Sequence, residues 1–215
     1  MLSNFKHDGF TLIELVVSVA IMSILSAVVF SSFITGNQRT LVRAATDQLI
    51  TDLQKQSTLA QAGQKYQGAT IFAYGLMTTA TSPIRSYTLF ADNDAPGTAT
   101  GTNWYGLPTT DRQGTTLDVG ETMATKNMPD RTEIAGVYTL LGDGTTVNSF
   151  GSIYYPVPGA STVVQYRKGD NTFDATDVTS MIVVVRHTKV TSIKECFRVV
   201  PRLQTVNRIA FASCP

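Results

Sequence analysis

The sequence predicts an α+β fold in which one long N-terminal helix with an apolar first half packs on an antiparallel β-sheet. Three observations lead to this class. Apolar residues run almost without a break from Phe10 to Ile34, and an amphipathic pattern follows from Leu41 to Ala60. From Thr70 onward, short β-rich runs alternate with Gly, Pro, Asp and Asn, which is typical of strands joined by turns.

The composition favours an exported protein over a charged cytosolic one. The chain has 215 residues, enough for one domain and an appended element. Only 15% of them are charged, against roughly 25% in an average soluble domain. The net charge of +1 excludes no partner, but basic residues dominate from Arg186 to Arg208, where Glu195 is the only acid.

The apolar segment is long enough to cross a membrane. At about 1.5 Å per residue, a helix from Phe10 to Ile34 spans the roughly 30 Å of bilayer hydrocarbon. A signal peptide removed at its far end, an uncut signal anchor and the buried helix of a soluble protein are three simpler interpretations. None of them explains Glu14, the one ionisable side chain in the segment, because a carboxylate at that depth costs roughly 2.5 to 3.5 kcal/mol.

The residues around Glu14 form a recognisable motif. Gly9-Phe10-Thr11-Leu12-Ile13-Glu14 closely resembles the processing site of type IV prepilins and pseudopilins. The resemblance implies that prepilin peptidase cleaves after Gly9 and methylates the new amine of Phe10. It also implies that Glu14 meets the amine of a neighbouring subunit, since opposite charges attract strongly at low dielectric and each is costly alone.

The same resemblance implies a structural role. We expect a minor pilin or pseudopilin of a type IV pilus or type II secretion pseudopilus, made as a single-pass precursor in the bacterial inner membrane with an extracytoplasmic head. Its partners would be the membrane, prepilin peptidase and other subunits of the filament. The expected parts are a cleaved leader (1–9), a transmembrane and assembly helix (10–35), an amphipathic helix (36–66) and a β-rich head (67–215).

The helix is expected to continue beyond the apolar segment. No proline occurs before Gly63 and Gly68, so one helix of about 80 Å is predicted. Ser31-Ser32 stand where many pilins carry a proline, and with Gly36 they can soften a helix. Leu41-Val42-Arg43-Ala44-Ala45 and the residues from Gln48 to Gln56 resemble the corresponding helix of the GspH/FimT group of minor pseudopilins and minor pilins.

The head is predicted to be antiparallel β structure laid against the amphipathic part of the helix, a helix followed by sheets. A loop is expected from Asp92 to Arg112, and Gly142-Asp143-Gly144 favours a tight turn. The predicted strands are residues 69–74, 86–91, 133–141, 152–157, 163–167, 181–186, 195–200 and 206–212.

The two cysteines, Cys196 and Cys214, both lie near the C-terminus. A pair confined to one end suggests a local disulfide, which persists in an oxidising compartment and contributes about 3 kcal/mol. Two buried free thiols are the alternative.

Nothing in the sequence indicates an enzyme or a cofactor. His7 falls in the expected leader, His187 closes an apolar strand, and motifs for a nucleophile, a phosphate loop or a metal set are lacking. Two acidic clusters could bind calcium, but Asp and Asn are also common turn residues, so we expect no metal site. The clusters are Asp92-Asn93-Asp94 and the set Asp170, Asn171, Asp174 and Asp177.

The basic C-terminal end raises the question of DNA. On a strand, Lys194, Arg198 and Arg202 would share one face and could attract a phosphate backbone. That pattern would suit a DNA-binding minor pilin of a competence pilus. We favour the simpler interpretation that they form the solvated face of an edge strand, which basic residues protect from aggregation.

Overall fold

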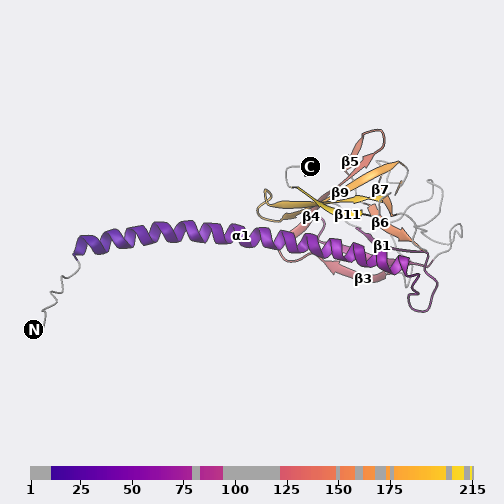
Figure 1. Ribbon diagram of the computed structural model, residues 1–215, viewed down its shortest axis with the longest axis horizontal. Helices are drawn as coiled ribbons and strands as arrows, with labels where there is room; N and C mark the ends of the chain where they lie inside the picture. The colour runs from indigo at the N-terminus through magenta and orange to yellow at the C-terminus, as the bar shows by residue number, and fades with distance from the viewer. Residues whose placement is uncertain are drawn as a thin grey trace, which may run out of the picture. The chain divides into compact units, whose positions relative to one another are not determined.

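The computed structural model describes residues 11–78, 83–93, 122–148, 151–157, 162–167, 173–174, 177–201, 205–210 and 214. The chain divides into two compact units, Met1–Gln38 and Arg39–Pro215. Helix α1 (Leu12–Gln61) contributes to both units (Figure 1). Its length confirms the predicted continuous helix, and the expected loop after Asp92 lies outside the described residues from residue 94 onward.

In the first unit, α1 presents apolar side chains all round. Every large hydrophobic residue from Leu12 to Ile34 is at least 49% exposed, and the helix is long and apolar enough to cross a membrane. The hydroxyls of Ser23, Ser26 and Thr35 donate to carbonyls four residues back. Their polar groups are therefore satisfied within the helix, as a hydrocarbon environment requires. No break in the helix occurs at Ser31-Ser32 or Gly36.

In the second unit, α1 is amphipathic as predicted. Its buried apolar residues recur at three- and four-residue steps: Val42, Ala45, Leu49, Leu53 and Ala60. The helix ends where the sequence indicated, because Gly63 adopts a φ of 58°. The Gly63 amide donates to the Ala60 carbonyl and the Gln64 amide to the Leu59 carbonyl, which is the hydrogen-bond pattern of a Schellman cap.

The predicted α+β class with an antiparallel β head is confirmed, and the strands of the head divide between two antiparallel sheets. The first sheet has the order β3-β2-β1-β6-β7-β8 and the second the order β11-β10-β9-β4-β5. Among the described strands, the chain crosses from the first sheet to the second after β3, returns after β5 and crosses again after β8. Strand propensity carries no information about which strand will be the partner. The strands of the first sheet are β1 (Ala73–Met77), β2 (Ser86–Asp92), β3 (Thr122–Asn127), β6 (Gly151–Pro156), β7 (Val163–Arg167) and β8 (Phe173–Asp174). Those of the second are β4 (Thr132–Leu141), β5 (Thr146–Asn148), β9 (Val178–His187), β10 (Lys194–Val200) and β11 (Thr205–Ile209).

Two details differ from the predicted strands. The strand expected over residues 69–74 begins only at Ala73 and continues through Gly75 to Met77. A Cβ at Gly75 would collide with the ring of Phe90 and the carbonyl of Ile153, so this glycine allows two strands to approach closely instead of ending one. Strands β3, β5 and β8 were not predicted. The turn at Gly142-Asp143-Gly144 does join β4 to β5.

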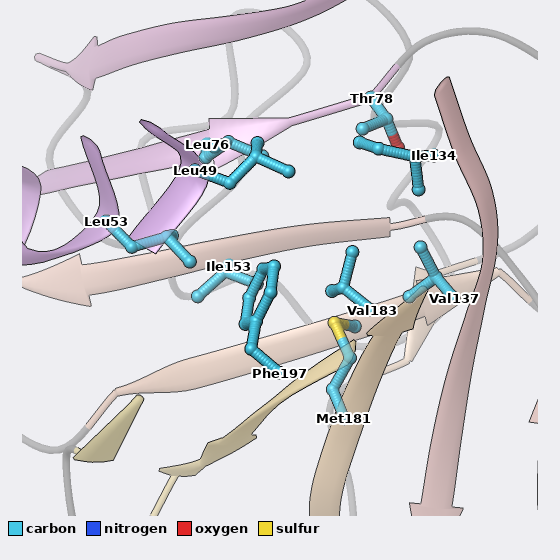
Figure 2. A pocket seen from close by; sticks show the side chains of 10 residues that line it. All are labelled: Leu49, Leu53, Leu76, Thr78, Ile134, Val137, Ile153, Met181, Val183 and Phe197. Carbon is cyan, nitrogen blue, oxygen red and sulfur yellow. The ribbon is translucent and has the colours of Figure 1, made fainter. Parts of the chain in front are cut away.

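The core of the head lies between α1 and the two sheets (Figure 2). Leu49 and Leu53 of the helix meet Ile153 of the first sheet and Val183 of the second around a cavity of about 20 Å³. The lining is apolar except for Thr78, so a water there would lack the two to four polar partners it needs. Reciprocal backbone hydrogen bonds of 3.2 and 2.9 Å join Ile84, just before β2 of the first sheet, to Ile134 in β4 of the second sheet.

Candidate functional site

The N-terminus of α1 is built around Thr11 and Glu14. The Thr11 amide donates to Glu14 Oε2 at 3.1 Å and the Thr11 hydroxyl donates to the same oxygen at 2.9 Å. In return, the Glu14 amide donates to Thr11 Oγ1 at 3.3 Å. This reciprocal arrangement is a capping box, in which a Thr at the N-cap and a Glu three residues on satisfy amides that the helix leaves free. The spacing Thr-x-x-Glu before an apolar run could have revealed it in the sequence.

The capping box gives Glu14 a partner within its own chain. Both donors from Thr11 go to Oε2, and Oε1 accepts no hydrogen bond from the described residues. A carboxylate has about four acceptor positions, so Glu14 keeps the capacity to accept from a second donor. Gly9 and Phe10, predicted to carry cleavage and methylation, lie outside the described residues.

Residues 4–30 match the family model of the prokaryotic N-terminal methylation motif. This chain carries the methylation motif of type IV pilin-like proteins. No curated protein and no solved structure matches it. The motif, the exposed apolar helix and the β-rich head together are consistent with a pilin-like fold, and proteins with this motif are structural rather than catalytic. The motif covers the N-terminus alone and does not address the resemblance to the GspH/FimT group.

The cysteines of this pilin-like head are bonded to each other. Cys196 in β10 and Cys214 form a disulfide with their Cα atoms 5.9 Å apart, which confirms the predicted pairing and excludes two free thiols. Cys196 pairs with Ile209 of β11 across the sheet. The bond therefore ties the end of the chain to the strand next to the edge.

The basic end is more neutral than its sequence indicates. Arg186 pairs with the buried Glu133 at 2.8 Å. Arg208 pairs with Asp47 of α1 and, at 3.5 Å, with Glu195. Two cations of the basic end thus hold acidic partners within the head.

Lys194 and Arg198 both lie in β10, four residues apart, and so share a face of the second sheet. The face is not that of an edge strand, because β10 pairs with β9 on one side and β11 on the other. That expectation is therefore wrong. Arg202 lies outside the described residues.

His187 ends β9, as predicted. Its Nδ1 accepts from the amides of Lys189 and Val190, at 3.2 and 3.1 Å, and the side chain is buried. The ring nitrogen that could act as a base is therefore occupied in holding the turn that leads to β10.

The acidic clusters form no metal centre among the residues that the structure describes. Asp94, Asp170 and Asn171 lie outside those residues. Asp92 is the buried last residue of β2, and Asp177 has a φ of 58° in the turn before β9, where an Asp is well suited to the left-handed conformation.

The sequence did not reveal a polar junction between α1 and the first sheet, formed by Gln48, Asp52, Tyr87 and Lys126. Asp52 is 5% exposed. The Tyr87 hydroxyl donates to its Oδ2 at 2.6 Å, and Lys126 Nζ lies 2.6 Å from its Oδ1. Gln48 Nε2 donates to the Tyr87 oxygen at 2.8 Å. Burial, together with the Asp52 carboxylate, raises the pKa of Tyr87 well above its usual value, so the phenol stays a donor.

Proposed function

We propose that this protein is a minor pilin or pseudopilin, a structural subunit of a type IV pilus or type II secretion pseudopilus. The observation that carries the proposal is the exposed apolar part of α1, from Leu12 to Ile34, most of which lies within the matched methylation motif at residues 4–30. Such a surface must be covered, since water-exposed apolar patches of this extent mark membrane or protein contacts. In this proposal the membrane covers it in the precursor, and neighbouring helices cover it in the filament.

Processing fits the same scheme. Prepilin peptidase would cut after Gly9 and methylate Phe10, leaving α1 as the anchor of a single-pass protein whose head is extracytoplasmic. The disulfide between Cys196 and Cys214 supports that location, because such bonds persist in oxidising compartments.

Glu14 would set the register between subunits. Thr11 occupies one of its oxygens, and the amine of Phe10 from a neighbouring subunit would pair with the carboxylate in the dry interior of the helix bundle. A carboxylate left without that partner would cost several kcal/mol there, so a subunit out of register is disfavoured.

The finer assignment we propose is to the GspH/FimT group. Its support is the amphipathic segment after Leu41, whose apolar positions Val42, Ala45, Leu49 and Leu53 are all buried in the head. The charged and amide positions between them include Asp47, Gln48 and Asp52, which contact the sheets.

The assembly role is tested by Glu14→Gln in the full chain, expressed with the other filament genes. The substitution keeps an oxygen for Thr11 but removes the charge that would attract an amine. We expect normal cleavage and membrane insertion, with the amount recovered in sheared filaments reduced at least about tenfold. Ser18→Ala, in the same exposed helix, is the matched control. Wild-type amounts of the Glu14→Gln subunit in filaments would contradict the proposal.

A DNA-binding minor pilin of a competence pilus is the second candidate. The shared face of Lys194 and Arg198 favours it, whereas the ion pairs of Arg186 and Arg208 reduce the free positive charge. A salt-dependent DNA shift by the full chain in detergent, weakened by Arg198→Gln but not by Arg43→Gln, would support it. Absence of a shift at low salt would exclude it.

A further inference from the structure

A cleft lies between the last turns of α1 and the beginning of β11. It has a volume of about 360 Å³, at the small end of the range for ligand sites. Gln54 and Gln61 stand two turns apart on the helix wall, Asn207 stands on the strand wall, and Tyr155 of β6 also lines the cleft. All these residues belong to the second compact unit, Arg39–Pro215.

The lining is polar but uncharged. Among the described residues that line the cleft, none carries a formal charge at neutral pH. The three amides of Gln54, Gln61 and Asn207 each offer donors and an acceptor, and Ser57 and Thr58 add hydroxyls. Gln54, Gln61 and Asn207 are exposed, so their amides can turn toward a ligand at little cost.

The cleft also holds an apolar surface and a hydroxyl that lacks a partner. Tyr155 is buried, with its pKa raised by burial, and Val206 lies beside it in the lining. Thr205 Oγ1 is buried and has no hydrogen-bond partner among the described residues. A buried hydroxyl without a partner is unfavourable, and a ligand hydroxyl that reached it from the cleft would relieve that cost.

We propose that this cleft binds a neutral saccharide. Sugars present donors and acceptors together on each hydroxyl and an apolar ring face, and the amides, hydroxyls and apolar residues of the cleft match both features. A charged ligand would find no opposite charge in the described lining. The proposal does not depend on the filament role and would survive its failure.

An extended peptide added to the edge strand β11 fits less well. Arg208 of β11 pairs with Asp47 of α1, so the strand and the helix are bridged directly after Asn207. Of the described residues of β11, only 205–207 then line the open cleft, a length of about 10 Å. A peptide strand needs a longer edge, whereas one or two sugar rings do not.

The test uses the full chain in a detergent without a sugar headgroup, on an array of neutral and acidic oligosaccharides. The strongest neutral ligand is then titrated calorimetrically against the wild type and the double variant Gln54→Ala/Asn207→Ala. Gln64→Ala/Asn127→Ala is the matched control, because both side chains are exposed and lie outside the cleft. Should the double variant melt at a lower temperature than the control, Gln61→Ala replaces it.

The expected result is binding of at least one neutral oligosaccharide, with affinity at least about tenfold weaker in the cleft variant and unchanged in the control. The proposal is overturned by an array on which only acidic oligosaccharides or none are bound. It is equally overturned if the cleft variant binds the neutral ligand as tightly as the wild type.

Discussion

Replacing Asp52 with alanine should weaken the head more than any surface substitution. Asp52 is the acceptor that α1 offers to Tyr87 of β2 and Lys126 of β3. Its loss leaves the buried Tyr87 hydroxyl with a donor and no acceptor, while Gln48 still donates to the phenol oxygen. Losing a hydrogen bond to a charged group costs about 1.5 to 3 kcal/mol.

The Lys126 contact adds less. The Lys126 side chain is 37% exposed, so its ammonium can turn to water, and partly exposed pairs contribute about 1 kcal/mol or less. The two terms together predict that Asp52→Ala lowers the free energy of unfolding by about 2 to 4 kcal/mol. Asp130→Ala, at an exposed position, should change it by less than about 0.5 kcal/mol.

The assay is urea unfolding of the full chain in detergent, followed by circular dichroism, on Asp52→Ala, Tyr87→Phe and the double variant. Because the two side chains contact each other directly, the cycle should give a coupling energy of about 1 to 2 kcal/mol. Strictly additive effects, or a cost for Asp52→Ala no larger than that for Asp130→Ala, would refute the reasoning.

Three further predictions concern the head. Gln56 is fully buried and its side-chain amide has no hydrogen-bond partner among the described residues. Gln56→Met should therefore raise the free energy of unfolding, measured in urea, by about 1 to 2 kcal/mol. A lower free energy of unfolding would show that the amide does make a hydrogen bond. The pKa values of Tyr87 and Tyr155 are raised by burial. The free energy of unfolding should therefore be constant with respect to these two groups below about pH 10 and should fall as the pH rises above that value, by up to about 1.4 kcal/mol per pH unit for each tyrosine. Alkaline unfolding monitored by phenolate absorbance checks this, and an equally steep loss in Tyr155→Phe would contradict it. Cys214→Ser opens a loop with a sequence separation of 18 and should cost about 3 kcal/mol in thermal or urea unfolding; an unchanged midpoint would argue against the disulfide.

The parts of the fold that depend on local sequence were predictable. The apolar run, the three- and four-residue spacing and Gly63 define α1 and its end, because helix patterning and capping act within a few residues. The strands β2, β4, β7 and β10 follow their β-rich runs closely. The disulfide was predictable because the chain has only two cysteines.

The parts that depend on distant partners were not predictable. Ile84 and Ile134 join regions 50 residues apart along the chain, and the division into two sheets depends on such pairings. Asp52 looked like one more polar residue on the solvent side of a helix, yet Tyr87 and Lys126 bring it into a buried junction. Arg208 looked like part of a free basic patch until Asp47, on a helix far earlier in the chain, became its partner.

The capping box at the start of α1 pairs one residue that stands out in the sequence with one that does not. Glu14 is conspicuous in the sequence as a charge in an apolar run, whereas its partner Thr11 is visible only in the light of capping geometry. Together they explain how one carboxylate can be held at the start of the helix before any neighbouring subunit is present.

The central claim is that the chain is processed as a prepilin and keeps its apolar helix. Intact-mass measurement of the protein purified from membranes of cells that contain prepilin peptidase tests it most directly. The account predicts a chain that lacks residues 1–9 and begins with a methylated Phe10. A mass equal to the whole chain, or to a chain that has lost the apolar segment up to Ile34, would contradict it.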